Sequence, residues 1–294
     1  MSDWVLGIIG GSGLYEIDGL ENPEWISIET PWGMPSDDIL FAELGSIKLR
    51  FLPRHGRGHP LTPSDVNYRA NIDAMKRAGC TDLLSLSAVG SLKADYPPGD
   101  FVIVDQFIDR TFKREKSFFG EGMVAHVSVA DPVCARMAGF AAKAAKAAGA
   151  SVHKGGTYLA MEGPQFSTKA ESHMYRSWGC DVIGMTNMPE AKLAREAELP
   201  YATVAMVTDF DCWHEAHGNV DVAAVIAVLM ENAAKASNTV REMVKILKAE
   251  GPRENGAQGI ETNLDVAMIT SPDARDPKRL AMLDAVAGRV LGEV

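Results

Sequence analysis

Short apolar runs alternate along the chain with longer segments in which apolar residues recur at helical spacing. Apolar residues fill most positions of these runs, a pattern typical of strands buried on both faces of a parallel or mixed sheet. The strands that we predict are VLGII (5–9), IKLRFL (47–52), DLLSLSAV (82–89), DFVIVDQFI (100–108), TYLAM (157–161), CDVIGM (180–185) and YATVAMV (201–207).

Good helix formers occupy several of the segments between these runs. We predict helices over residues 63–79, 132–149 and 222–250, because their apolar positions repeat at helical spacing. Thr62 is a candidate N-cap for the first of these helices, and Gly79 is its candidate C-cap. Strands that alternate with helices indicate an α/β fold.

The order of these elements predicts one domain. No Pro/Gly/Ser-rich linker and no internal repeat divides the chain, so we expect a single α/β domain over residues 1–294. Its centre should be a mixed, mostly parallel sheet flanked by helices. Residues 251–294 form a tail without an assigned function, which is either a docked element or a loosely held appendage.

Composition narrows the classes of partner. The net charge of -10 would repel both nucleic acid and an anionic membrane surface. The longest uncharged apolar stretch, residues 222–230, is too short to span a membrane, and the first apolar run begins too early for a signal peptide. The cysteines show no CxxC spacing, so we expect a cytoplasmic protein without zinc or disulfides; they are Cys80, Cys134, Cys180 and Cys212.

Three motifs at the ends of predicted strands suit an anion. GIIGGSGL (7–14) offers backbone amides and the Ser12 hydroxyl, PRHGRGH (53–59) offers a cluster of cations and donors, and SAVGSL (87–92) offers a hydroxyl and amides. Each could also be an ordinary turn or a solvated loop. His55 and His59 lack a third ligand, so we predict no metal. Because ligands gather at the carboxyl ends of strands, the three motifs should converge on one phosphate.

Three further motifs suit a planar base and a sugar. MEGPQFS (161–167) presents Phe166 at a helix start, and IGMTNMPE (183–190) places Met185 and Thr186 after a strand. TDFDCW (208–213) places Asp209 and Asp211 two residues apart, so both carboxyls project to the same side of an extended backbone. Core packing of Phe166, strand-end packing around Met185 and an acidic helix cap are the plainer interpretations. In an apolar pocket, however, such a carboxyl can serve as a general acid.

In chain order these motifs resemble the trimeric purine nucleoside phosphorylase family, in its branch that acts on S-methyl-5'-thioadenosine, and the resemblance implies that the single α/β domain is nucleoside phosphorylase-like. The resemblance covers roughly residues 5 to 245. It rests on GIIGGSGL, PRHGRGH, PSDVNYRANI, CTDLLSLSAVGSL, PGDFVIVDQFIDRT, EGPQFST, SWGCDVIGMTNMPEAKLARE and VTDFDCW.

The resemblance implies roles for individual residues. Phosphate would be held by Ser12, Arg54, His55, Ser87, the amide of Ala88, and Thr186. Met185 would line the ribose, Phe166 would stack on the purine, and Asp209 would be catalytic, meeting the base together with Asp211. The pocket for the 5' group would be formed by Val222, Ile226 and, from a neighbouring subunit, His126.

The resemblance also implies an activity. The expected reaction is the phosphorolysis of S-methyl-5'-thioadenosine to adenine and 5-methylthioribose 1-phosphate by a homotrimer that uses no cofactor and takes inorganic phosphate as co-substrate. A phosphorylase of broader or 6-oxopurine specificity is the alternative. Relatives that use 6-oxopurines carry Asn where Asp209 stands and Glu where Ser167 stands, so this sequence keeps the aminopurine pattern.

Other classes of protein fit the sequence less well. A nucleoside hydrolase usually needs an Asp-rich calcium cluster, which the sequence does not suggest. A dinucleotide-dependent dehydrogenase is disfavoured because Glu16 stands where the last glycine of G-x-G-x-x-G should be. A module that binds a nucleoside or phosphate without turnover is the remaining alternative.

Overall fold

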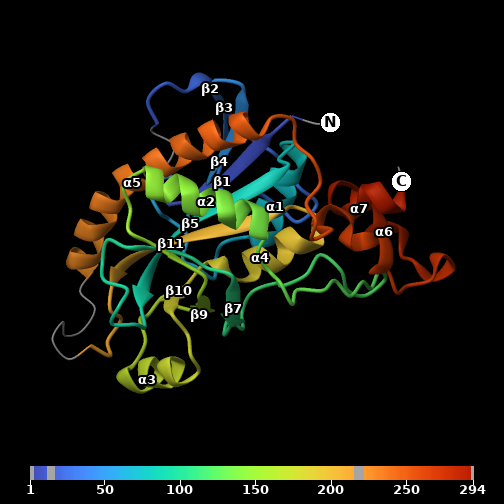
Figure 1. The fold of residues 1–294 in the computed structure, drawn as a ribbon. Helices are drawn as coiled ribbons and strands as arrows, with labels where there is room; N and C mark the ends of the chain where they lie inside the picture. Colours follow the sequence, from blue (N-terminus) through green and yellow to red (C-terminus); the bar gives the residue numbers. More distant parts are fainter. Residues whose placement is uncertain (1–2, 12–16, 215–221, 293–294) are drawn as a thin grey trace.

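The computed structural model describes residues 3–11, 17–214 and 222–292 (Figure 1). Its strands join in one 11-stranded sheet, in which the order β2-β3-β4-β1-β5-β10-β9-β7 forms the main path, β11 pairs with β5 and β6, and β8 pairs with β6. The strands are β1 (Val5–Gly10), β2 (Glu21–Ile26), β3 (Ile39–Leu44), β4 (Ile47–Pro53), β5 (Asp82–Ser91), β6 (Phe101–Ile103), β7 (Gln106–Asp109), β8 (Val152–Lys154), β9 (Thr157–Ala160), β10 (Val182–Gly184) and β11 (Tyr201–Asp209).

The central strand β5 is the place where the sheet forks. One of its edges runs parallel to β11 for most of its length. The other edge pairs with β1 up to Ser85 and with β10 only from Gly90 onward. Among the described residues, no strand pairs with residues 86–89 on that edge, so the main-chain groups that point there are available to side chains or to a ligand.

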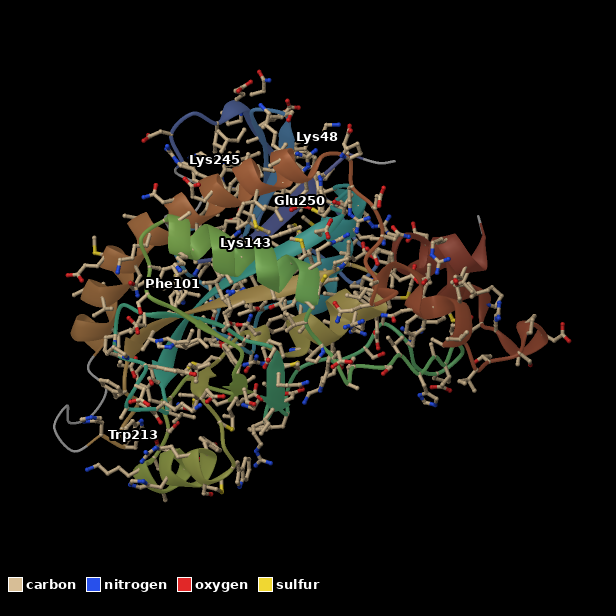
Figure 2. The ribbon with its side chains drawn as sticks, viewed as in Figure 1. Lys48, Phe101, Lys143, Trp213, Lys245 and Glu250 are labelled. Atoms are coloured by element: carbon tan, nitrogen blue, oxygen red, sulfur yellow. The ribbon has the colours of Figure 1, made fainter. Side chains whose placement is uncertain are left out.

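Helices cover both faces of this sheet. The alanine-rich α2 (Ala135–Ala147) and the long α5 (Val222–Glu250) lie side by side on one face, and α1 (Tyr68–Arg77) and α4 (Asn187–Glu196) pack in the core of the other (Figure 1). Figure 2 labels Phe101 of β6, which is buried in the core under α2 and α5. It also labels Lys143 of α2 and Lys245 of α5, which lie on the exposed sides of these helices.

One further helix, α3 (Lys169–Ser177), lies apart from these layers (Figure 1). It begins with a capping box, in which the Thr168 hydroxyl accepts from the Glu171 N–H and the Glu171 carboxylate accepts from the Thr168 N–H. No helix in the described part of the chain is both long enough and apolar enough to cross a membrane.

Most of the predicted elements are confirmed, with shifts at their ends. The first predicted helix starts later than expected, because the N-cap is Asn67, whose side chain accepts from the Ala70 N–H; the Thr62 prediction is wrong. The run 100–108 is two strands, since the chain leaves β11 and β8 after Ile103 and joins β9 from Gln106 onward. The sequence pattern does not predict the exposed edge strand β2, the strands β3 and β8, or the helix α4.

The tail after Gly251 is docked on the body of the protein. It contains the 3₁₀ segments η1 (Ile260–Val266) and η2 (Pro272–Ala274) and the helices α6 (Pro277–Met282) and α7 (Asp284–Leu291). Leu264, Leu283 and Val286 are buried in the same core as α1 and α4. Of the two interpretations that the sequence left open, the docked element is therefore confirmed.

Candidate active site

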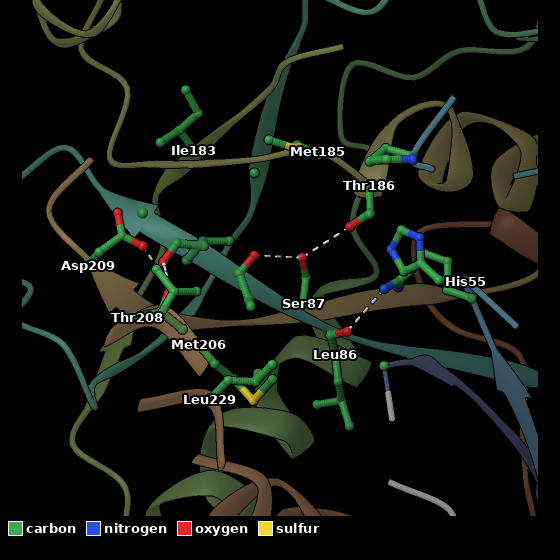
Figure 3. A pocket seen from close by; sticks show the side chains of 18 of the residues that line it. His55, Leu86, Ser87, Ile183, Met185, Thr186, Met206, Thr208, Asp209 and Leu229 are labelled. Carbon is green, nitrogen blue, oxygen red and sulfur yellow. Dashed lines mark hydrogen bonds between the residues drawn. The ribbon is translucent and has the colours of Figure 1, made fainter. Parts of the chain in front are cut away.

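A cavity of about 330 Å³ opens at the carboxyl ends of the central strands (Figure 3). Its wall comes from the segments that follow β1, β4, β9 and β10, from the second half of β5, from the end of β11 and from the start of α5. Figure 3 shows Asp209 and His55 at opposite ends of this cavity, with Ser87 between them. The cavity thus joins the predicted base end to the predicted phosphate end.

Nine of the predicted site residues line this cavity: Arg54, His55, Ser87, Ala88, Phe166, Met185, Thr186, Asp209 and Asp211. Ser12 and the side chain of Val222 fall outside the described residues. The Ile226 side chain is half exposed and is not part of the cavity wall, which α5 forms instead with Val225, Leu229 and Ala233. The i, i+4, i+8 spacing of these three residues is the sequence signal that could have identified them.

The phosphate end of the cavity is rich in hydroxyl groups. The Ser87 Oγ lies 3.1 Å from the Thr186 Oγ1 and 3.2 Å from the Tyr158 hydroxyl. Ala88 lies in the forked part of β5. In a strand, the main-chain groups of residues two apart point to the same edge. The Leu86 carbonyl accepts from Arg54 on the unpaired edge of β5, so the Ala88 N–H points to that edge as well. This is the donor expected from Ala88.

Arg54 is buried under the phosphate end with a carboxylate partner that sequence reasoning missed. Its Nε and Nη2 donate to the two carboxylate oxygens of Glu190 at 2.8 and 3.1 Å, and its Nη1 donates to the Leu86 carbonyl at 3.2 Å. Burial alone would lower the pKa of Arg54, but the charge of Glu190 outweighs it and raises that pKa. The two-pronged face of the guanidinium is therefore occupied, and the second N–H of Nη1 is the donor left for an anion.

His55 is a neutral group in this site. Burial, together with the positive charge of Arg54, lowers the pKa of His55 to about 4. Its Nδ1 lies 3.0 Å from the Leu61 carbonyl, which can only accept, so Nδ1 carries the ring hydrogen. The Nε2 of the neutral ring is then a hydrogen-bond acceptor.

The base end of the cavity holds the two carboxyls at the end of β11. The Asp209 Oδ2 accepts from the Thr208 hydroxyl at 2.8 Å and its Oδ1 accepts from the Asp211 N–H at 2.7 Å. Burial raises the pKa of Asp209, and it raises that of Asp211, where the nearby charge of Asp209 adds to the effect. Gly90 makes room for this arrangement, since a Cβ there would lie 2.9 Å from the Asp209 Oδ1.

The two remaining predicted ligand contacts, Phe166 and Met185, come from two loops that contact each other. Phe166 is 45 % exposed, so its ring is not part of the core, against the plainer interpretation of that residue. Gly163, in the same loop, has a φ of +68°, and a Cβ there would lie 2.6 Å from the Met185 sulfur. Glycine is therefore required for the MEGPQFS loop to pack against the residue expected to line the ribose.

His126 lies away from this cavity. Its side chain is exposed, and its N–H donates to the Ala267 carbonyl at 2.9 Å, which joins the segment before α2 to the tail. A role for His126 at the cavity would have to be played in a neighbouring subunit, as the resemblance implied.

Comparison with known proteins agrees with this geometry. The chain is 61% identical over 287 residues to an S-methyl-5'-thioadenosine phosphorylase of Cereibacter sphaeroides, with 98% of each chain covered. It is 61% identical over 289 residues to the enzyme of that name from Rhodospirillum rubrum, with 98% of this chain and 97% of the relative covered.

Solved structures give the same result. A methylthioadenosine phosphorylase from an antarctic soil metagenomic library superposes with a TM-score of 0.90 at 47% identity, covering 97% of this chain and 99% of its own. A methylthioadenosine phosphorylase from Schistosoma mansoni in complex with adenine gives a TM-score of 0.80 at 36% identity, over 89% and 96% of the two chains. The family model described as the phosphorylase superfamily matches residues 5–245, and the chain belongs to that superfamily.

Proposed function

We propose that this chain catalyses the phosphorolysis of S-methyl-5'-thioadenosine to adenine and 5-methylthioribose 1-phosphate. The observation that carries the proposal is one cavity that has hydroxyls and the open main-chain edge of β5 at one end and, at the other, the carboxyls of Asp209 and Asp211, both with raised pKa. The relatives of that name, similar over nearly the whole chain, support the choice of substrate.

The phosphate end would position the nucleophile. Ser87, Thr186, the Ala88 N–H and the remaining N–H of Arg54 would hold the phosphate oxygens beneath C1', and the His55 Nε2 would accept from a protonated one. As the bond between C1' and N9 lengthens, the ribosyl ring gains positive charge, which the phosphate stabilises before it forms the new bond to C1'.

The base end would assist the leaving group. The purine gains negative charge as it departs, and Asp209, whose acid form is favoured by burial, would donate a proton to N7 so that neutral adenine leaves. The apolar wall of Val225, Leu229 and Ala233 would accept the methylthio group. Such a wall changes the selection against a hydroxyl by only ~1–3 kcal/mol, so adenosine should be a slower substrate, not an excluded one.

One chromatographic assay tests this function. Purified protein is given S-methyl-5'-thioadenosine, adenosine, inosine or methylthioinosine, each with and without phosphate, and the free base is measured. Adenine released only with phosphate supports the proposal. Preferential release of hypoxanthine supports the 6-oxopurine alternative, release without phosphate indicates a hydrolase, and no release at all leaves a binding module.

We also propose that the protein is a homotrimer. The segment that carries His126 and the neighbouring tail expose Phe112, Val266 and Ile269, and such apolar side chains favour burial against another subunit. Light scattering on the purified protein should give three times the chain mass. A monomer would remove the role given to His126.

A cytoplasmic location is the last part of the proposal. The cysteines at 80, 134, 180 and 212 are all unpaired and buried, which suits a reducing compartment. Cell fractionation tests this location, and recovery of the protein outside the cytoplasm would contradict it.

A further inference from the structure

Arg114 is a buried arginine whose side chain bonds mainly to main-chain carbonyls. Its Nη1 donates to the carbonyls of Met185 and Met188, each at 2.7 Å, and its Nη2 donates to the Glu162 carbonyl at 2.8 Å. The Glu162 carboxylate lies 3.5 Å from its Nε and balances its charge. Nothing in the function described above uses this residue.

The carbonyls that Arg114 holds belong to two loops of the active site. Met185 lines the cavity and directly precedes Thr186, the proposed phosphate ligand. Because a peptide unit is planar and trans, fixing the Met185 carbonyl toward Arg114 points the Thr186 N–H in the opposite direction. Glu162 begins the turn that leads to Phe166, so the same guanidinium fixes the start of the base-binding loop.

A third loop is tied to the same side chain. The Arg114 Nη1 lies 3.1 Å from the Tyr68 hydroxyl, which donates to the Pro63 carbonyl at 2.9 Å. Pro63 lines the cavity and belongs to the loop that carries His55. One planar cation thus connects the segments that follow β4, β9 and β10, the loops at both ends of the cavity.

From these contacts we propose that Arg114 is a positioning residue for phosphorolysis, which sets the register of the phosphate loop against the base loop. The proposal rests on the function proposed above. A guanidinium is suited to the task because its donors project in fixed directions, whereas a lysine ammonium in the same place would be a single point donor. A misplacement of reacting groups by about 1 Å can lower the rate about 100-fold, so loss of the clamp should be costly.

Arg253 provides a matched control at the other end of the sheet. It is buried to a similar degree, pairs with Asp82 at 2.5 Å and donates to the Thr81 carbonyl at 3.1 Å, near the start of β5. We therefore compare R114Q, R114K and R114A with R253Q, R253K and R253A. Each is assayed for kcat, for KM of S-methyl-5'-thioadenosine, for KM of phosphate and for Tm.

We expect R114Q to raise both KM values and to lower kcat/KM at least about 100-fold, with R114K between it and the wild type. The Arg253 variants should lose Tm but keep their KM values. Added guanidinium should restore part of the activity that R114A has lost and should not raise the activity of R253A. Sodium chloride is the ionic-strength control. If the Arg114 variants lose kcat only in proportion to their folded fraction, with unchanged KM, the proposal is wrong.

The same variants separate this proposal from the proposed function. If the wild-type protein releases no adenine with phosphate, the function fails, and the clamp is tested by the rise in Tm that adenine and phosphate together produce. A rise in wild type and R253K that is absent in R114K supports the clamp. Equal rises in all three proteins overturn it.

Discussion

Replacement of Asp209 by Asn tests the proposed acid with little disturbance of the fold. In the structure both Asp209 oxygens accept hydrogen bonds, one from the Thr208 hydroxyl and one from the Asp211 N–H. An asparagine carbonyl can keep the bond from the Asp211 N–H. Its NH₂ can then donate to the Thr208 oxygen, because the single hydroxyl hydrogen of Thr208 can turn to the Val89 carbonyl, 3.2 Å away. We therefore expect D209N to fold and to lose only the proton that it would give to N7.

The size of the loss follows from the chemistry. General acid assistance is worth about 10²–10⁴-fold, or about 3–5 kcal/mol of barrier, so kcat for S-methyl-5'-thioadenosine should fall within that range. Methylthioinosine should lose less, because an asparagine suits a 6-oxopurine. The assay is the release of adenine and of hypoxanthine from the two nucleosides at saturating phosphate. An unchanged ratio of the two rates would refute the assigned role.

Thr208 supplies the control for this experiment. Valine in its place keeps the shape but removes the hydrogen bond that lowers the pKa of Asp209, so that pKa should rise further. The acid form of Asp209 is lost as pH rises through its pKa. In T208V the alkaline decline of kcat should therefore move to higher pH while kcat at its optimum is retained, and in D209N the decline should disappear.

Other predictions concern pH, the tail and the assembly. Burial raises the pKa of Glu196 to about 7, above its unfolded value of 4.5, so its contribution to stability is present below pH 4.5 and is lost as pH rises to 7. E196Q should raise Tm relative to the wild type at pH 8 and not at pH 4; an equal change at both would contradict this. L283A should lower the free energy of unfolding by about 2–5 kcal/mol in urea, whereas a loosely held tail would show almost no change. Co-expressed subunits of H126A and D209N should recover activity that neither variant has alone, because some sites would then combine Asp209 with His126 of a neighbour; no recovery would exclude a shared site.

The sequence predicts those parts of the fold that depend on nearby residues. The runs around β1, β5 and β11 are apolar because these strands are buried on both faces, and that pattern is visible without any partner. Edge strand β2 is mostly exposed and carries no such pattern, so it was missed. The division of residues 100–108 into two strands depends on which strands lie beside them, and local periodicity does not contain that information.

The same limit applies to the tail and to the wall of the cavity. The helical pattern near the end of the chain is visible, but the docking of the tail depends on contacts of α7 with α1 and of η1 with α4, which are far away in sequence. The residues of α5 that line the cavity share one helix face, yet the sequence does not say which turn of a 29-residue helix reaches the carboxyl end of β5. Ile226 is therefore the residue named from the sequence, whereas the residue of this turn that lines the cavity is its neighbour Val225.

The charge of the phosphate site shows most clearly what long-range contacts change. The motif PRHGRGH predicts a cluster of cations, but Arg54 is paired with Glu190, which is 136 positions away. Arg57 is paired with Asp37 at the surface, and the pKa of His55 is lowered to about 4. The cluster therefore presents little net positive charge to a phosphate, and hydroxyls, amides and one N–H must supply most of the recognition. An ion held by dipoles is screened less by salt than one held by exposed charges, so KM for phosphate should change little with ionic strength. A steep rise of that KM on adding sodium chloride would show that a free cation, not this neutral pair, binds the phosphate.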